Sequence, residues 1–160
     1  MQLGESFVGD GVNAAHINTV LGVRDGPVGT AWATGLASPS EGHAPFVVVL
    51  KPGLPVRPFT LFVNKARMQS EGHANITWGA AQAGVASGVA DALSDGVVDG
   101  DDVLIAAVWV NPSADDADAV FVNNREATRN ALVMGHANGP APDDVVAARD
   151  DAWNPFFRPR

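Results

Sequence analysis

The stretch that decides the fold lies near the start of the chain and reads AAHINTVLGV, residues 14–23. Its apolar side chains alternate, so that Ile17 and Leu21 share one face, which is typical of a strand with one buried face. His16 and Asn18 project from the opposite face. We therefore predict a β-strand here that presents an imidazole and an amide on its second face.

Other strands and helices are predicted on either side of this stretch. Apolar runs predict strands at 3–8, 44–52, 57–68 and 102–112, and helical spacing predicts helices at 27–39, 73–96 and 116–139. The continuous run at 44–52 is expected to be covered on both faces. The order β-β-α-β-β-α-β-α indicates an α/β (α+β) fold of two layers, in which helices pack on one face of a mixed β-sheet.

The packing of these layers has two expected consequences. The helix predicted at 73–96 is rich in Ala and Gly, which indicates a close approach to the sheet or to a neighbouring helix. Helices on one face leave the opposite apolar face of the sheet uncovered. We expect oligomerisation through that face or through the sheet edges, and active sites between subunits would follow.

Composition bounds the class of protein. The 160 residues suit one domain, which we assign to residues 1–137, with residues 138–160 as a Pro- and Asp-rich C-terminal tail. The net charge of −8 repels phosphate backbones, so no nucleic-acid partner is expected. The absence of cysteine excludes disulfides and thiolate chemistry. No leader and no run long enough to span a membrane is visible, so we expect a cytoplasmic protein with no membrane partner.

Two segments at the borders of the predicted fold have simple interpretations. Residues 9–14, GDGVNA, match the glycine pattern of a dinucleotide-binding turn. That fingerprint needs a helix directly after it, whereas a strand is predicted there, so we interpret the stretch as a turn between two strands.

The tail ends in WNPFFRPR and is either disordered or docked through its aromatic rings.

The chain has four histidines, and their spacing gives no metal-ligand pattern. His43 and His73 lie in the similar contexts SEGHAP and SEGHAN, and both are expected to be solvated. His136 lies at the end of a predicted helix, where a cation suits the helix dipole. No metal site is therefore expected.

Four polar side chains each have two interpretations. His16 is either a buried histidine that its neighbours hydrogen-bond or a proton donor, since the chain lacks Cys and Tyr and imidazole exchanges protons near neutrality. Lys65 and Arg67 are either cations at a strand end with buried stems or a clamp for a substrate carboxylate or phosphate. Gln82 is either exposed to solvent or recognises a heterocyclic ligand through hydrogen bonds.

Several segments, taken in order, resemble the formaldehyde-activating enzyme family, the tetrahydromethanopterin hydro-lyases. They are GESFVGDG followed by AAHI, then DGPVGTAWATGL, VVVLKPGLPVRP, TLFVNKA, WGAAQAGVASGVADAL and NREATRNAL. The similarity extends from about Leu3 to Gly135 with almost no gaps. It implies a topology like that of a ribosomal-protein domain.

The resemblance also implies an activity. Members of this family condense formaldehyde with the reduced pterin tetrahydromethanopterin to give methylenetetrahydromethanopterin and water, a step of one-carbon metabolism, methylotrophy and formaldehyde detoxification. Tetrahydromethanopterin is the co-substrate, and no prosthetic group or metal is required. Family members are homopentamers with sites between adjacent subunits, so a homopentamer is the expected oligomer.

The family's functional positions are carried over residue by residue. The catalytic histidine of the family falls on His16. Its pterin-contacting positions fall on Asn18, Val47, Lys65, Arg67 and Gln82. Where Asn18 stands the family typically has Asp, and where Arg67 stands it typically has Thr. These departures leave an alternative open: a catalytically altered paralogue that binds a formaldehyde adduct or acts on a different pterin, folate-like or amine ligand.

Overall fold

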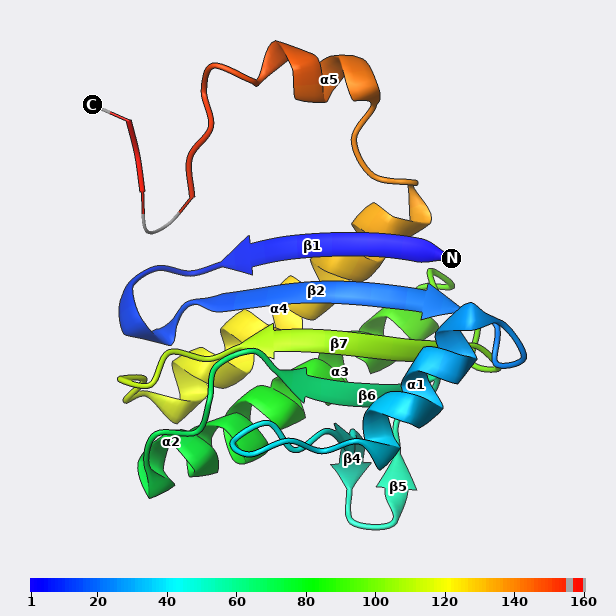
Figure 1. Cartoon of the computed structure of the whole chain (residues 1–160), viewed down its shortest axis with the longest axis vertical. Helices are drawn as coiled ribbons and strands as arrows, with labels where there is room; N and C mark the ends of the chain where they lie inside the picture. The colour runs from blue at the N-terminus through cyan, green and yellow to red at the C-terminus, as the bar shows by residue number, and fades with distance from the viewer. Residues whose placement is uncertain (155–156, 160) are drawn as a thin grey trace.

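A five-stranded mixed sheet forms the centre of the computed structural model, which describes residues 1–154 and 157–159 (Figure 1). Its strands follow the order β1-β2-β7-β6-β3, in which β6 and β7 are parallel and the other neighbours are antiparallel. The five strands are β1 (Gln2–Val8), β2 (Ala15–Gly22), β7 (Val103–Trp109), β6 (Phe59–Asn64) and β3 (Phe46–Val47). A separate hairpin consists of β4 (Val49–Lys51) and β5 (Leu54–Pro55).

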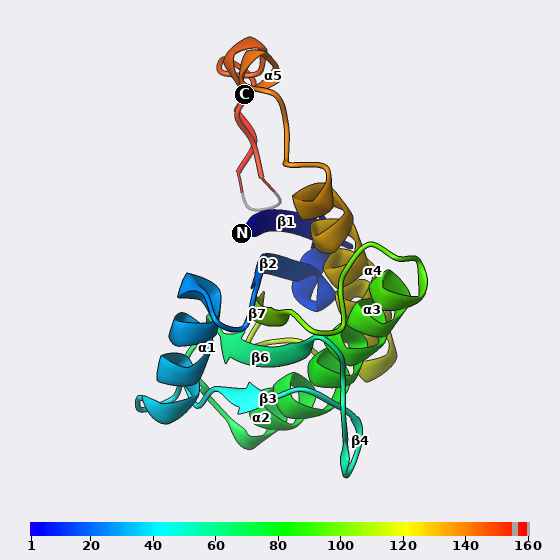
Figure 2. The ribbon, with the colours of Figure 1, turned by 90° about the vertical axis from the view of Figure 1, so that its right-hand side faces the viewer.

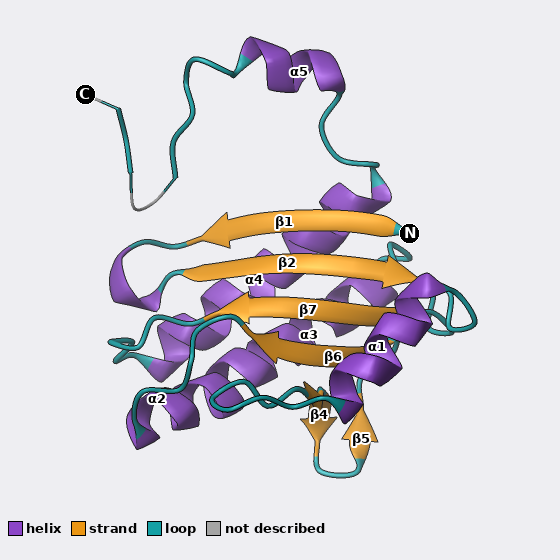
Figure 3. Cartoon of the chain, in the orientation of Figure 1, coloured by secondary structure: helices purple, strands orange, loops and turns teal. Residues whose placement is uncertain are grey.

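Helices lie on both sides of this sheet but unequally (Figure 2). The long helices α3 (Gln82–Ser94) and α4 (Ala117–His136) pack together along one face, and α3 is preceded by α2 (Glu71–Ile76) and the π-helical turn η2 (Thr77–Ala81). Helix α1 (Pro27–Ala37) crosses one end of the opposite face, and α5 (Pro142–Ala147) lies beyond the sheet edge (Figure 3). The predicted mixed α/β architecture is confirmed, but the expectation that the helices pack on one face alone is wrong, because α1 contacts the sheet from the opposite face.

Strand β2 has the predicted alternation. Ala15 and Ile17 are fully buried against the helical layer, whereas His16 and Asn18 are half-buried on the opposite face. The turn before β2 is also confirmed, because Gly9 and Gly11 both have positive φ and the short 3-10 helix η1 (Gly11–Asn13) leads into the strand. This turn makes β1 and β2 antiparallel neighbours.

Helices α3 and α4 approach so closely that glycine is required at their contact. A Cβ added at Gly88 would lie 2.4 Å from the backbone oxygen of Arg125, and one added at Gly84 would lie 2.4 Å from that of Phe121. The Ala- and Gly-rich composition of this segment is therefore explained, as predicted, by contact with a neighbouring helix.

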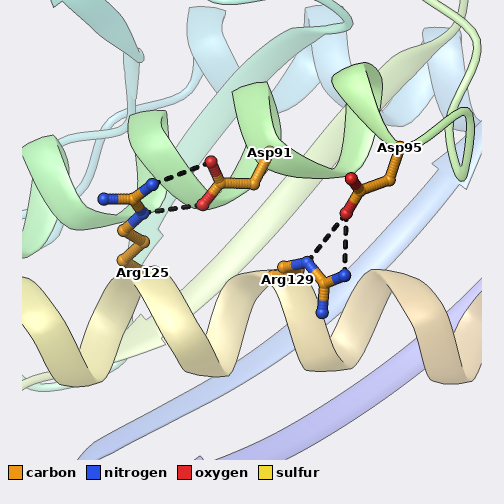
Figure 4. A network of polar contacts seen from close by, with 4 residues as sticks. All are labelled: Asp91, Asp95, Arg125 and Arg129. Atoms are coloured by element: carbon orange, nitrogen blue, oxygen red, sulfur yellow. Dashed lines mark hydrogen bonds and ion pairs between the residues drawn. The ribbon is translucent and has the colours of Figure 1, made fainter.

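Two ion pairs join the exposed edges of the same helices (Figure 4). Arg125 donates two hydrogen bonds to Asp91, of 2.6 and 2.9 Å, and Arg129 donates to Asp95 at 2.9 Å. The bonds from Arg125 lower the pKa of Asp91 below its ordinary value. Such exposed pairs contribute little to stability.

The strand predicted at 44–52 is wrong in its extent and in its burial. Strand β3 ends at Val47, and the chain from Val49 onward pairs with β5 instead of with the sheet, through a turn in which Gly53 has a positive φ of 81°. Leu50 and Leu54 consequently lie 46% exposed in the hairpin. The strand predicted at 57–68 likewise ends at Asn64, so that Lys65 and Arg67 follow β6 and do not belong to it.

The expectation of a solvated His73 is also wrong. Its side chain is buried beneath α2, where Nε2 lies 3.1 Å from the backbone oxygen of Val110. Ser70 caps this helix by accepting a hydrogen bond from the backbone N–H of His73. His43 is half-buried, with Nδ1 2.9 Å from the backbone oxygen of Asn64. Both imidazoles therefore have a structural role.

The segment after α4 passes outside β1 and returns toward it (Figure 1). Trp153 lines a cavity of about 300 Å³ together with Glu5, Phe7 and Asn154. Trp153 is nevertheless 53% exposed and stacks with Arg158 of the same tail, so neither alternative for the tail is decided. Phe157 is 61% exposed, and Phe156 lies outside the described residues.

Candidate active site

His16 is held on the sheet face that faces away from α3 and α4. Its ring stacks on Phe7 of the neighbouring strand, with the ring centres 3.8 Å apart and the planes 9° from parallel. Nε2 lies 3.2 Å from Oε1 of Glu5 and 3.4 Å from Nδ2 of Asn18. The imidazole is thus fixed in its plane by an aromatic ring and at one nitrogen by polar groups.

Three influences act on the protonation of His16. Burial is the largest, and it lowers the pKa of His16 because a partly desolvated imidazole is harder to charge. The Glu5 carboxylate raises this pKa, and the Lys65 ammonium lowers it. The net result is a pKa below the ordinary value, so the ring is mainly neutral at pH 7 and exchanges its proton readily.

Sequence reasoning missed Glu5 and Phe7. The turn at residues 9–14 could have identified them, because a tight turn pairs β1 with β2 and so determines which residues of the two strands share a face. In the observed register Phe7 lies opposite His16, and Glu5 lies opposite Asn18. All four side chains therefore project from the same face of the hairpin.

Val47 and Gln82 lie together at another place, the β3 edge of the sheet. With Phe46, Val49 and Trp78 they line a cavity of about 330 Å³. Gln82 is 8% exposed, and its Oε1 accepts a hydrogen bond of 2.7 Å from the backbone N–H of Val49. The amide is therefore buried rather than solvated, and its NH₂ group remains as the donor that a ligand in the cavity would meet.

The six predicted site residues consequently form two groups and an outlier. His16 and Asn18 share one group with Lys65, which is exposed beyond β6 and influences the imidazole electrostatically. Strands β7 and β6 lie between β2, which carries His16 and Asn18, and β3, which carries Val47; this corresponds to ~14 Å at the usual strand spacing. Arg67 belongs to neither group, because its guanidinium contacts the Glu41 carboxylate on an exposed loop.

Other kinds of site are not indicated in the parts of the chain that the structure describes. Within residues 1–154 and 157–159, no cluster of three or more His, Asp or Glu side chains is arranged to hold a metal ion. In the same residues no helix is both long and apolar enough to cross a membrane.

The fold and this site define a class of protein: a mixed α/β domain with a half-buried imidazole on one face of its sheet. The sequence profile described as Formaldehyde-activating enzyme (Fae) matches residues 3–157, and the chain belongs to this family. The match continues well past Gly135, where the similarity was expected to end.

Two relatives illustrate the similarity. A 5,6,7,8-tetrahydromethanopterin hydro-lyase of Methanosarcina barkeri is 37% identical over 96% of this chain and 89% of its own length. A bifunctional enzyme Fae/Hps of Methanosphaera stadtmanae is 38% identical over 98% of this chain, which spans 39% of that longer relative.

Proposed function

We propose that this protein condenses formaldehyde with tetrahydromethanopterin to form methylenetetrahydromethanopterin and water, with His16 as the proton donor. The observation that carries this proposal is the imidazole held at the sheet face, in a chain that belongs to the formaldehyde-activating enzyme family. A relative of almost the same length is named as a tetrahydromethanopterin hydro-lyase.

The chemistry needs one well-placed acid and base. An amine of the pterin adds to formaldehyde and gives a carbinolamine, N–CH₂–OH. Hydroxide is a poor leaving group, so the carbinolamine loses its oxygen as water when His16 donates a proton to it. A second amine of the pterin then attacks the resulting iminium carbon, and its proton returns to His16. Such general acid catalysis contributes roughly 10²–10⁴-fold in rate.

The cavity at the β3 edge is the proposed binding site of the pterin ring. Its walls are the apolar side chains of Phe46, Val47 and Val49 with the indole of Trp78, which suit a flat heterocycle. The Gln82 amide can donate to a ring nitrogen or oxygen because its own oxygen is occupied by Val49. Lys65 and Asn18 would bind the polar part of the ligand near His16.

We further propose that a second copy of the chain completes each site. Within one chain, two strands separate His16 on β2 from Val47 on β3, and Gln82 of α3 lines the same cavity as Val47; one ring system in that cavity is too far from His16 to contact it. A copy that places its β3 edge over the His16 face of a neighbour brings the two groups together. This arrangement is compatible with the homopentamer expected from the family resemblance, and with a cytoplasmic enzyme that needs no prosthetic group.

The proposed reaction is tested by mixing formaldehyde with tetrahydromethanopterin and following product formation with and without the protein. The expected result is a rate well above the spontaneous condensation, and a smaller acceleration or none with tetrahydrofolate. Acceleration with tetrahydrofolate alone, or with neither acceptor, would contradict the proposal.

A further inference from the structure

Glu5 has no part in the function proposed above, yet its carboxylate lies beside the proposed proton donor. Glu5 and His16 occupy neighbouring strands and are diagonal partners in the β1–β2 register. Oε1 of Glu5 lies 3.2 Å from Nε2 of His16, and the two side chains are 47% and 26% exposed. The pair is accessible to a ligand while it is partly shielded from water.

The contact distinguishes the two nitrogens of the imidazole. A carboxylate only accepts hydrogen bonds, so its approach to Nε2 favours the form in which that nitrogen carries a hydrogen. The amide of Asn18 also lies against Nε2, at 3.4 Å. This Asn18 group is an NH₂ donor and cannot bond to Nε2–H, so the shorter contact with Glu5 is the one that favours this form. With Nε2 directed at Glu5, Nδ1 is the nitrogen left for a substrate, and the stack on Phe7 fixes the plane of the ring.

The charges around the ring act in opposite directions. Glu5 approaches from β1 and favours the imidazolium, while Lys65 beyond β6 disfavours it. Strand β7 contributes the uncharged Trp109 opposite His16. Asp10 and Arg158 lie farther out, where they line a cavity with Phe7, and they have opposite charges.

We infer that Glu5 is a positioning residue for His16: its carboxylate accepts a hydrogen bond from Nε2–H, keeps the ring able to take up a proton, and reserves Nδ1 for transfer of that proton to the substrate. The catalytic part of this inference rests on the proposed function. The electrostatic part does not, because it concerns the titration of His16 in the protein alone.

The test compares Glu5→Gln with Glu126→Gln. Both variants replace a glutamate by its amide, but Glu126 is exposed on α4, in the layer on the other side of the sheet. Nitrogen and proton NMR of the His16 ring then gives its pKa and its neutral tautomer. In Glu5→Gln we expect a lower His16 pKa and a smaller fraction of the Nε2–H tautomer, and in Glu126→Gln we expect the values of the unsubstituted protein.

The rate of condensation supplies the second measurement. A general acid works in its protonated form, so the alkaline decline of kcat/KM in Glu5→Gln should move to lower pH, with a loss of roughly 3–30-fold at neutral pH that shrinks in acid. The variant Glu5→Gln/Asn18→Asp places a carboxylate where the Asn18 amide now lies 3.4 Å from Nε2, and we expect it to recover most of the lost pKa and rate.

The possible results separate this inference from the proposed function. An unchanged His16 pKa and tautomer in Glu5→Gln would overturn the inference, whatever the protein catalyses. Absence of condensation by the unsubstituted protein, together with the expected NMR shifts, would reject the proposed function and leave the Glu5–His16 coupling standing. An equal rate loss at every pH, with no rescue by Asn18→Asp, would show that Glu5 acts on something other than the proton of His16.

Discussion

At the residue scale, the reactivity of His16 depends on a balance between burial, one carboxylate and one ammonium group. Burial and Lys65 lower the pKa of His16, and Glu5 raises it. The net effect is a lowered pKa of His16, and the Glu5 carboxylate opposes that lowering. Each neighbour can be removed separately because Glu5 belongs to β1 and Lys65 to the segment after β6.

Removal of Lys65 tests the opposing side of this balance. In Lys65→Met the pKa of His16 should rise, because the cation that disfavours the imidazolium is lost. NMR titration of the His16 ring measures the shift, and the alkaline decline in catalysis should move to higher pH in parallel. Lys51→Met, on the β4–β5 hairpin, is the matched control. A His16 pKa that falls or stays constant in Lys65→Met would contradict the account.

The sequence predicts the positions of some of these side chains but not of others. The alternation in residues 14–23 was sufficient to place His16 and Asn18 on one face. Glu5 was not identified as a partner because its position depends on the register between two strands, which the turn geometry determines. His43 and His73 share the motif SEGHA but differ in structure. Ser40 forms a β-bridge with His43, whereas Ser70 caps the helix that contains His73.

At the scale of elements, the contact between α3 and α4 is the most tightly constrained part of the fold. A methyl group at Gly88 would meet the backbone oxygen of Arg125 at 2.4 Å, and backbone cannot move aside as a side chain can. We expect Gly88→Ala to lower the free energy of unfolding by about 1–3 kcal/mol through overpacking.

Urea denaturation monitored by circular dichroism measures this change. Gly72→Ala is the control, since its nearest neighbour would be Ser70 Oγ at 3.8 Å and alanine favours a helix. We expect the control to be neutral or slightly more stable. Equal stability of Gly88→Ala and the unsubstituted protein would contradict the close contact described here.

The elements differ in how far the sequence predicted them. Strand β2 and the long helices are predicted from a clear period, and β1 and β7 from apolar runs that lie between turn residues. The apolar run at 44–52 has no such period, so it could not show that the chain leaves the sheet after Val47. That departure creates the hairpin and one wall of the cavity that contains Gln82.

At the scale of the whole molecule, the separation of His16 from Gln82 is the main argument for a shared site. It predicts that two inactive variants can complement each other. His16→Gln lacks the proton donor, and Gln82→Glu keeps the acceptor for Val49 but lacks the amide donor to the ligand. In a co-expressed mixture, some interfaces combine an intact His16 with an intact Gln82.

The mixture should therefore recover a substantial part of the activity that each variant lacks alone. Sedimentation analysis of the same samples would show whether the variants form one mixed oligomer. A mixed oligomer without recovered activity would contradict a site built from two copies and would favour a site within one chain.

The central claim is that His16 donates the proton in a condensation of formaldehyde with tetrahydromethanopterin. The most direct measurement is the catalysed rate of His16→Gln above the spontaneous background, compared with His136→Gln at the exposed end of α4. Glutamine preserves a donor toward Glu5 but cannot supply a proton. The account predicts a loss of roughly 10²–10⁴-fold in His16→Gln and an unchanged rate in His136→Gln. A folded His16→Gln protein that retains the full acceleration would contradict it.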